Sequence, residues 1–265
     1  MNYPPDNLKS KKSFRCKAFT LVELLAVVAV MLLVLKLTLP TLDGLMGKNG
    51  KGMARGQLIG DLNRARSLAL QNGEPVYLVF MPLFEKVLLS NPNPAWNSSV
   101  LDRVKKTYFE TDPDANSLLG IQLTGYAIYS EGKPSISLPP KWHSDWKTLP
   151  EGFCFDRSTL DFLPHKASVS FLKPDGAKAP LGSRLILPAL KYKKRGVLEG
   201  ADLRGLYLSV SKGGVFPPAI DPNDSGGKYS AKDADAPEEQ PEDDRQWLHV
   251  NGVTGRSGVV ELTQS

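Results

Sequence analysis

The sequence predicts an α+β protein, in which a long, partly transmembrane N-terminal helix packs on an antiparallel β-sheet domain. The first observation behind this prediction is an apolar stretch over residues 19–39. The second is a downstream chain whose short β-branched and aromatic runs alternate with turn residues, with 21 Pro and 23 Gly overall. Such punctuation favours strands and turns over a helical bundle. No helix-length periodic segment separates the strand candidates, which favours antiparallel pairing over βαβ units.

The first element is a basic leader, residues 1–18. The chain has a formal net charge of +5, and most of it lies here, where five basic residues accompany only Asp6. The rest of the chain is close to neutral, with 28 basic and 27 acidic residues. A basic stretch before an apolar run holds that end in the cytoplasm. The charge therefore indicates a single pass through the inner (cytoplasmic) membrane with a periplasmic or extracellular C-terminal domain, and it argues against nucleic acid as a partner.

The second element is the apolar stretch FTLVELLAVVAVMLLVLKLTL, in which only Glu23 and Lys36 carry charge. A helix of these 21 residues is about 31 Å long, which matches the hydrocarbon core of a bilayer. We therefore expect a transmembrane helix over residues 19–40. Glu23 leaves two interpretations open, a carboxylate that tolerates the membrane edge or one that pairs with a positive partner. A cut between Ala18 and Phe19 would create such a partner, a free amine shortly before Glu23.

Residues 17–25, KAFTLVELL, resemble the prepilin peptidase recognition site of type IV pilins and type II secretion pseudopilins. The resemblance implies cleavage between Ala18 and Phe19 and N-methylation of Phe19. It also implies filament assembly through Glu23, which would pair with the new amino terminus of a neighbouring subunit. Pro40 stands where many pilins carry a helix-kinking proline. Ala18 departs from the glycine that the family usually has before the cut, and its small size is compatible with cleavage.

A glycine-rich joint follows over residues 41–56. Each glycine costs a helix interior about 1 kcal/mol relative to alanine, so we expect a kinked or partly melted connection. It would serve either as a flexible joint for subunit packing or as a simple linker. Helix is predicted again over Gln57–Asn72, where apolar residues recur at helical spacing and Asn72-Gly73 supplies a stop. This helix opens the domain of residues 57–265, and Val76–Phe80 is its first predicted strand.

The remaining chain carries strand candidates separated by turns. They cover residues 121–129, 152–155, 168–172, 184–190, 205–210, 247–250 and 258–262. The helical segment Asp61–Ala69, DLNRARSLA, and the turn Thr254-Gly255-Arg256 resemble the H-type minor pseudopilin (GspH/FimT-like) family. This resemblance implies a pilin-like domain. We interpret Arg64 and Arg66 as a solvated helix face rather than a binding site.

Two stretches of this domain, about 82–117 and 217–245, have the composition of loop insertions, the first with a short helix over Ser99–Thr107. Between Asp221 and Asp244, nine acidic residues face two lysines. Such a segment buries little apolar surface. We interpret it as a solvated loop rather than a calcium site, because its carboxylates lack the tight, regular spacing of a calcium loop.

No constellation of an enzyme is present, so we predict no catalytic residue, no metal site and no cofactor. His143, His165 and His249 are isolated, and the chain has no phosphate-binding, dinucleotide or GxSxG motif. Cys154 lies in an apolar context and is predicted to be a buried, inert thiol without a disulfide partner. Two clusters keep a second interpretation. Residues 142–146, with two tryptophans, either cap the sheet or line a ligand site, and the basic residues 191–195 form either a solvated hairpin tip or a DNA-binding patch.

These observations and resemblances predict a structural and assembly subunit, a minor pilin or pseudopilin of a type II secretion or type IV pilus-like filament. Its expected partners are other pilin or pseudopilin subunits, prepilin peptidase, an inner-membrane assembly platform and membrane lipid. Two alternatives stay open. One is a pilin-like tip subunit that binds DNA or a surface ligand, and the other is a membrane-anchored protein of unknown activity.

Overall fold

The computed structural model describes residues 21–90, 97–132, 139–169, 184–201, 205–213, 215, 217–220, 228–230 and 246–260. Ala18, Phe19, the rest of the leader and most of the acidic segment 217–245 lie outside the described residues. The chain divides into two units, Met1–Lys48 and Asn49–Ser265. The boundary falls inside the stretch where the sequence predicts a joint. Everything below on sheets, cores and cavities concerns the second unit.

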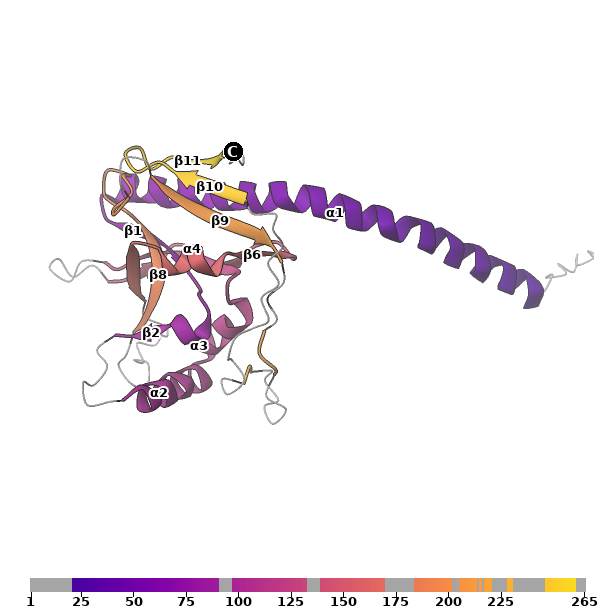
Figure 1. The fold of residues 1–265 in the computed structure, drawn as a ribbon, viewed down its shortest axis with the longest axis horizontal. Helices are drawn as coiled ribbons and strands as arrows, with labels where there is room; N and C mark the ends of the chain where they lie inside the picture. The colour runs from indigo at the N-terminus through magenta and orange to yellow at the C-terminus, as the bar shows by residue number, and fades with distance from the viewer. Residues whose placement is uncertain are drawn as a thin grey trace, which may run out of the picture. The chain divides into compact units, whose positions relative to one another are not determined.

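The chain combines one long helix with shorter helices and short strands (Figure 1). In chain order they are α1 (Leu21–Asn72), β1 (Val76–Phe80), η1 (Phe84–Lys86), β2 (Leu88–Leu89), α2 (Ser98–Thr111), α3 (Pro113–Leu118), η2 (Leu119–Ile121), β3 (Gly125–Ser130), β4 (Lys141–Trp142), β5 (Lys147–Thr148), β6 (Phe153–Phe155), α4 (Arg157–Asp161), β7 (His165–Val169), β8 (Leu185–Tyr192), β9 (Leu206–Lys212), β10 (Gln246–Val250) and β11 (Ser257–Val260).

The strands form two sheets in which every described pairing is antiparallel. The larger sheet has seven strands in the order β2-β8-β1-β3-β4, with β5 paired to β3 and β7 paired to β8. The smaller sheet has four strands in the order β11-β10-β9-β6. The chain is therefore α+β with antiparallel sheets, as the sequence predicted, although the helices α2 and α3 separate β2 from β3.

Strand β1 shows why the domain has two cores. All five of its residues are buried. Because successive side chains point to opposite faces of a sheet, Leu78 and Phe80 join one apolar cluster while Val79 joins another. The first cluster, here the helix core, unites α1 with both sheets, and the second, here the outer core, unites the larger sheet with α2 and α3. A strand covered on both faces reads as a continuous apolar run, which VYLVF is.

The C-terminal part of α1 packs along one stripe. Its buried residues recur at spacings of three and four and are Ala54, Leu58, Leu62, Ala65 and Ala69, each at most 1% exposed. The helix ends at Asn72, and Gly73, with φ 62°, turns the chain into β1. The predicted helix over residues 57–72 and strand over 76–80 are confirmed.

Two predictions about the N-terminal region are wrong. Among the described residues, no helix has a stretch long and apolar enough to cross a membrane, which takes about 20 mainly apolar residues. The fold is therefore not the partly transmembrane arrangement that we expected. The connection over residues 41–56 is also not melted, because α1 is one helix from Leu21 to Asn72. In the second unit the helix is buried at Gly50 and from Ala54 onward, and this packing opposes the cost of the glycines there, which is about 1 kcal/mol each.

The stretch 82–117 is more structured than an insertion of loops. Helices α2 and α3 begin at side-chain caps, where Asn97 accepts from the Val100 amide and Asp112 accepts from two amides of α3. Helix α2 buries Tyr108 and Phe109 in the outer core. These residues close one face of the larger sheet, so the stretch belongs to the domain rather than decorating it.

Candidate functional site

The start of α1 exposes apolar side chains on every side of the helix. They are Leu21, Val22, Leu24, Leu25, Val27, Val28, Val30 and Met31, each between 48% and 77% exposed. These residues form four pairs of sequence neighbours, and together the pairs are distributed around the whole helix rather than along one stripe. Glu23 and Pro40 both lie in α1, and their side chains, like residues 18 and 19, are outside the description. The filament-assembly role of these residues therefore stays a prediction.

A buried carboxylate fixes the other part of α1 to the larger sheet. Asp61 is 5% exposed, and each of its oxygens has a donor. Lys147 Nζ lies 2.6 Å from Oδ1, and the Tyr126 hydroxyl donates to Oδ2 at 2.9 Å. Gln57 Nε2 donates to the Tyr126 hydroxyl and to the Thr148 carbonyl, both at 2.8 Å. This network, here the Asp61 anchor, joins α1 to β3 and β5.

The electrostatics of the anchor keep its donors in place. Burial, the largest cause, raises the pKa of Tyr126, and Asp61 raises it further, against the opposing effect of the Gln57 hydrogen bond. The phenol therefore stays a hydrogen-bond donor at neutral pH. The sequence marked Asp61 only as part of a resemblance, and the structure assigns it a structural role.

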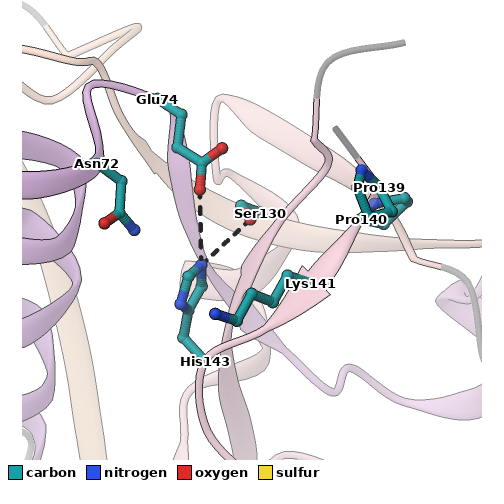
Figure 2. A pocket seen from close by; sticks show the side chains of 7 residues that line it. All are labelled: Asn72, Glu74, Ser130, Pro139, Pro140, Lys141 and His143. Atoms are coloured by element: carbon teal, nitrogen blue, oxygen red, sulfur yellow. Dashed lines mark hydrogen bonds and ion pairs between the residues drawn. The ribbon is translucent and has the colours of Figure 1, made fainter. Parts of the chain in front are cut away.

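A cavity of about 470 Å³ opens at the end of α1 (Figure 2). Its lining residues come from the end of α1, the turn between α1 and β1, the end of β3, and the chain from just before β4 to just after it. They are Asn72, Glu74, Ser130, Pro139, Pro140, Lys141 and His143. The backbone of His143 donates to the Ile128 carbonyl at 2.8 Å, which holds the imidazole against β3.

The carboxylate in this cavity is buried but has no donor. Glu74 is 7% exposed, and its Oε2 has no hydrogen-bond partner among the described residues. Its Oε1 lies 3.9 Å from His143 Nε2, which is beyond hydrogen-bond distance. The Ser130 hydroxyl lies 3.1 Å from that same nitrogen. Figure 2 shows the imidazole below both groups, with Lys141 beside it.

The imidazole is neutral at pH 7. Burial is the largest cause that lowers the pKa of His143, and the charges of Lys141 and Arg64 lower it further. The charge of Glu74 opposes them without reversing the direction. His143 therefore does not supply the positive charge that Glu74 lacks.

Ser130, His143 and Glu74 do not form a nucleophilic triad. In such a triad the serine and the acid contact different nitrogens of the imidazole, so that the acid fixes the tautomer while the other nitrogen takes the proton. Here both groups approach Nε2. The described residues also contain no cluster of three or more His, Cys, Asp and Glu side chains that would hold a metal.

The aromatic residues next to this cavity belong to the outer core. Trp142 stacks between Tyr129, at 4.6 Å between ring centroids, and Trp146, at 5.6 Å. Both tryptophans pack against the buried residues of the outer core. Of the two interpretations that the sequence left open for residues 142–146, sheet capping fits the tryptophans, and His143 alone lines the cavity.

The basic cluster lies at the hairpin tip after β8. A salt bridge of 2.7 Å joins Lys191 to Glu199, and Lys193 lies 3.8 Å from the same carboxylate. The hydrogen bond from Lys191 is the largest cause that lowers the pKa of Glu199. Lys194 and Arg195 are exposed at the tip. One acid thus compensates part of the cluster, as expected of a solvated hairpin.

The two segments that carry the family resemblance meet in space. Arg66 Nε donates to the Thr254 carbonyl at 2.7 Å, which ties the Asp61–Ala69 helix to the Thr254-Gly255-Arg256 turn. Gly255, with φ 65°, lies so close to the Gly196 carbonyl that a Cβ would stand 2.0 Å away. Arg64 is exposed, as predicted for a solvated helix face, although it also donates to the His143 carbonyl at 3.2 Å, whereas Arg66 is partly buried.

The other predicted site residues are dispersed. Cys154 is fully buried in β6, as its apolar context predicted. His165 lies in β7 and His249 in β10, so the three histidines do not converge. The only sequence signal that could have identified Glu74 as a site residue is its position, because it is an acid between a helix stop and a fully buried strand. Ser130 carries no sequence signal, because only strand pairing brings it to the cavity.

No known protein family, curated protein or solved structure matches this chain.

Proposed function

We propose that this chain is a structural and assembly subunit, a minor pilin or pseudopilin, of a type II secretion or type IV pilus-like filament. The observation that carries the proposal is the start of α1, where eight large apolar side chains are exposed around the helix. A helix that is apolar on all sides requires partners that bury it. Equivalent helices of neighbouring subunits would supply those partners, at about 25 cal/mol for each Å² of apolar surface removed from water.

The other part of α1 supports the same proposal. Its buried stripe and the Asp61 anchor hold residues 54–69 to the sheets. A subunit built in this way would present one part of a single helix for assembly and use the other part to carry its own domain. The proposed division of labour needs no catalytic group, and the cavity geometry does not suggest one.

In this proposal prepilin peptidase cuts between Ala18 and Phe19, and Phe19 is N-methylated. The new amine then pairs with Glu23 of a neighbouring subunit, which neutralises a carboxylate in an apolar surrounding where an unpaired charge is costly. The domain of residues 57–265 lies on the periplasmic side. The partners are other pilin or pseudopilin subunits, the peptidase and an inner-membrane assembly platform.

Mass spectrometry of the mature N-terminus tests the processing. We expect a chain that begins at N-methylated Phe19 and therefore lacks the leader cysteine, Cys16. A mature chain that begins at Met1 contradicts the proposal.

A substitution tests the assembly step. The variant Glu23→Ala should be exported normally and be absent from sheared filaments, whereas Glu110→Ala, at an exposed position of α2, should be incorporated like the parent chain. Leu24→Cys in the processed chain should give cysteine cross-links between subunits, because Cys154 is buried and does not compete. Normal incorporation of Glu23→Ala overturns the mechanism.

A further inference from the structure

The cavity at Glu74 contains a buried carboxylate to which no described residue donates a hydrogen bond. The residue is 7% exposed, Oε2 has no partner among the described residues, and Oε1 has only the distant contact with His143. Removing an ionised carboxylate from water without hydrogen bonds or a counter-charge is costly, and buried polar groups in native proteins are nearly always paired. A bound group that donates hydrogen bonds would remove this cost.

The neighbours of Glu74 limit what that group is. Lys141 and the amide of Asn72 line the same cavity and offer donors to an anion, and Arg64 lies close enough to affect His143. A simple cation would satisfy Glu74 but add to the positive charge of Lys141 and Arg64. A simple anion would satisfy Lys141 and leave Glu74 uncompensated. A ligand that carries both a positive and a negative group can pair with Glu74 and with Lys141, and it adds no net charge to the cavity.

We propose that this cavity binds a free α-amino acid. The ammonium group donates to Glu74, the carboxylate accepts from Lys141 and Asn72, and the side chain lies against the apolar surface of Pro139 and Pro140. The volume of about 470 Å³ falls in the range of small-molecule sites, which is roughly 300–1,000 Å³. The lining residues belong to the second unit, whereas the exposed start of α1 belongs to the first, so this proposal does not rest on the proposed filament assembly.

Isothermal titration calorimetry of the full chain tests the class of ligand. L-Leucine, L-glutamine and L-lysine represent apolar, polar and basic side chains, and we expect at least one to bind. For L-leucine the matched probes are isopentylamine, which lacks the carboxylate, and 4-methylpentanoate, which lacks the ammonium group. Each should bind at least about tenfold more weakly than the amino acid that contains both groups, because it loses one charge-assisted set of hydrogen bonds. If L-glutamine or L-lysine binds instead of L-leucine, the matched probes are the decarboxylated and the deaminated forms of that amino acid.

Substitutions locate the site. Glu74→Gln and Lys141→Met should each weaken binding by about tenfold or more, while the matched controls Glu151→Gln and Lys166→Met, at exposed positions, should bind like the parent chain. If either of these variants unfolds, the binding affinity of Asn72→Ala, a change at the exposed end of α1, tests the same site. The proposal is overturned if none of the three amino acids binds up to millimolar concentrations, if isopentylamine binds as tightly as L-leucine, or if folded Glu74→Gln binds unchanged.

Discussion

Asp61 and Glu74 are two buried carboxylates on neighbouring stretches of the same unit, and they differ in one respect. They are 5% and 7% exposed, so each is removed from water to nearly the same degree. Asp61 receives a hydrogen bond on each oxygen, from Lys147 and from Tyr126. Glu74 receives none among the described residues. Burial alone therefore does not distinguish them, and their partners do.

The difference separates a structural acid from a binding acid. A buried charge is tolerated when neighbouring groups replace the water that it loses, and it is a liability when they do not. Asp61 stands within a complete network that joins α1 to the sheet. Glu74 faces a cavity that holds space for the partner it lacks. Each prediction below changes one side of this comparison.

The largest effect is expected from removing the anchoring acid. Asp61→Ala deletes the acceptor of both donors and leaves the Tyr126 hydroxyl buried without its acceptor, so we expect a loss of about 2–4 kcal/mol in the free energy of unfolding. Lys147 is partly exposed and can return to water, which keeps the loss below that of a fully buried pair. Urea unfolding measures it. Asp145→Ala, at an exposed position, should change stability by less than about 0.5 kcal/mol, and an equal loss in both variants contradicts the role of the anchor.

A smaller loss is expected at the hydroxyl of the same network. Tyr126→Phe keeps the ring in the helix core and removes one donor to Asp61, so the unfolding free energy should fall by about 1–2 kcal/mol. The double variant Tyr126→Phe/Asp61→Ala should lose less unfolding free energy than the sum of the two single losses, because both changes remove the same hydrogen bond. Strict additivity in urea unfolding indicates that the two side chains do not interact.

A pH dependence is expected on the other side of the comparison. The pKa of His143 is lowered by burial and by Lys141 and Arg64. As the pH falls, His143 in the unfolded chain takes up a proton near the ordinary histidine pKa of about 6.5. In the folded chain it takes up the proton only at a lower pH. The stability from neutral His143 is therefore fully present above that pH and is lost as the pH falls toward the folded pKa, by at most about 1.4 kcal/mol per pH unit. Denaturation midpoints measured from pH 7.5 to 5 should fall more steeply in the parent chain than in His143→Gln, and equal slopes refute the assignment.

The sequence predicted the parts of this comparison unequally. Residues 58, 62, 65 and 69 recur at helical spacing, so the stripe that packs α1 could be recognised, as could the buried β1 strand. Local pattern also placed most strands, because turn residues interrupt them. It could not place Lys147 or Tyr126 beside Asp61, or Ser130 and His143 beside Glu74. Those contacts depend on how β3, β4 and β5 pair with one another, and no local pattern encodes that pairing.

Three sequence predictions were wrong. Glycines over residues 41–56 predicted a break in α1, and the structure has none. The stretch 82–117 resembled a loop insertion, although Tyr108 and Phe109 complete the outer core. The transmembrane prediction rested on the apolar run over residues 19–39, and no helix of the described residues meets the requirements of a membrane span. For the stretch 82–117, composition indicated an average tendency and missed the long-range contacts of Tyr108 and Phe109.

The smallest effect on stability is expected at Glu74, and it separates the two acids most clearly. Glu74→Gln removes a carboxylate that receives no hydrogen bond from the described residues and keeps the size of the side chain. The unfolding free energy without ligand should therefore stay within about 0.5 kcal/mol or rise by up to about 1 kcal/mol. The equivalent change Asp61→Asn should lower it by about 1.5–3 kcal/mol, because Lys147 loses its ionic partner. Parallel urea titrations compare the pair, and a loss at Glu74 as large as that at Asp61 shows that a partner inside the protein already satisfies it.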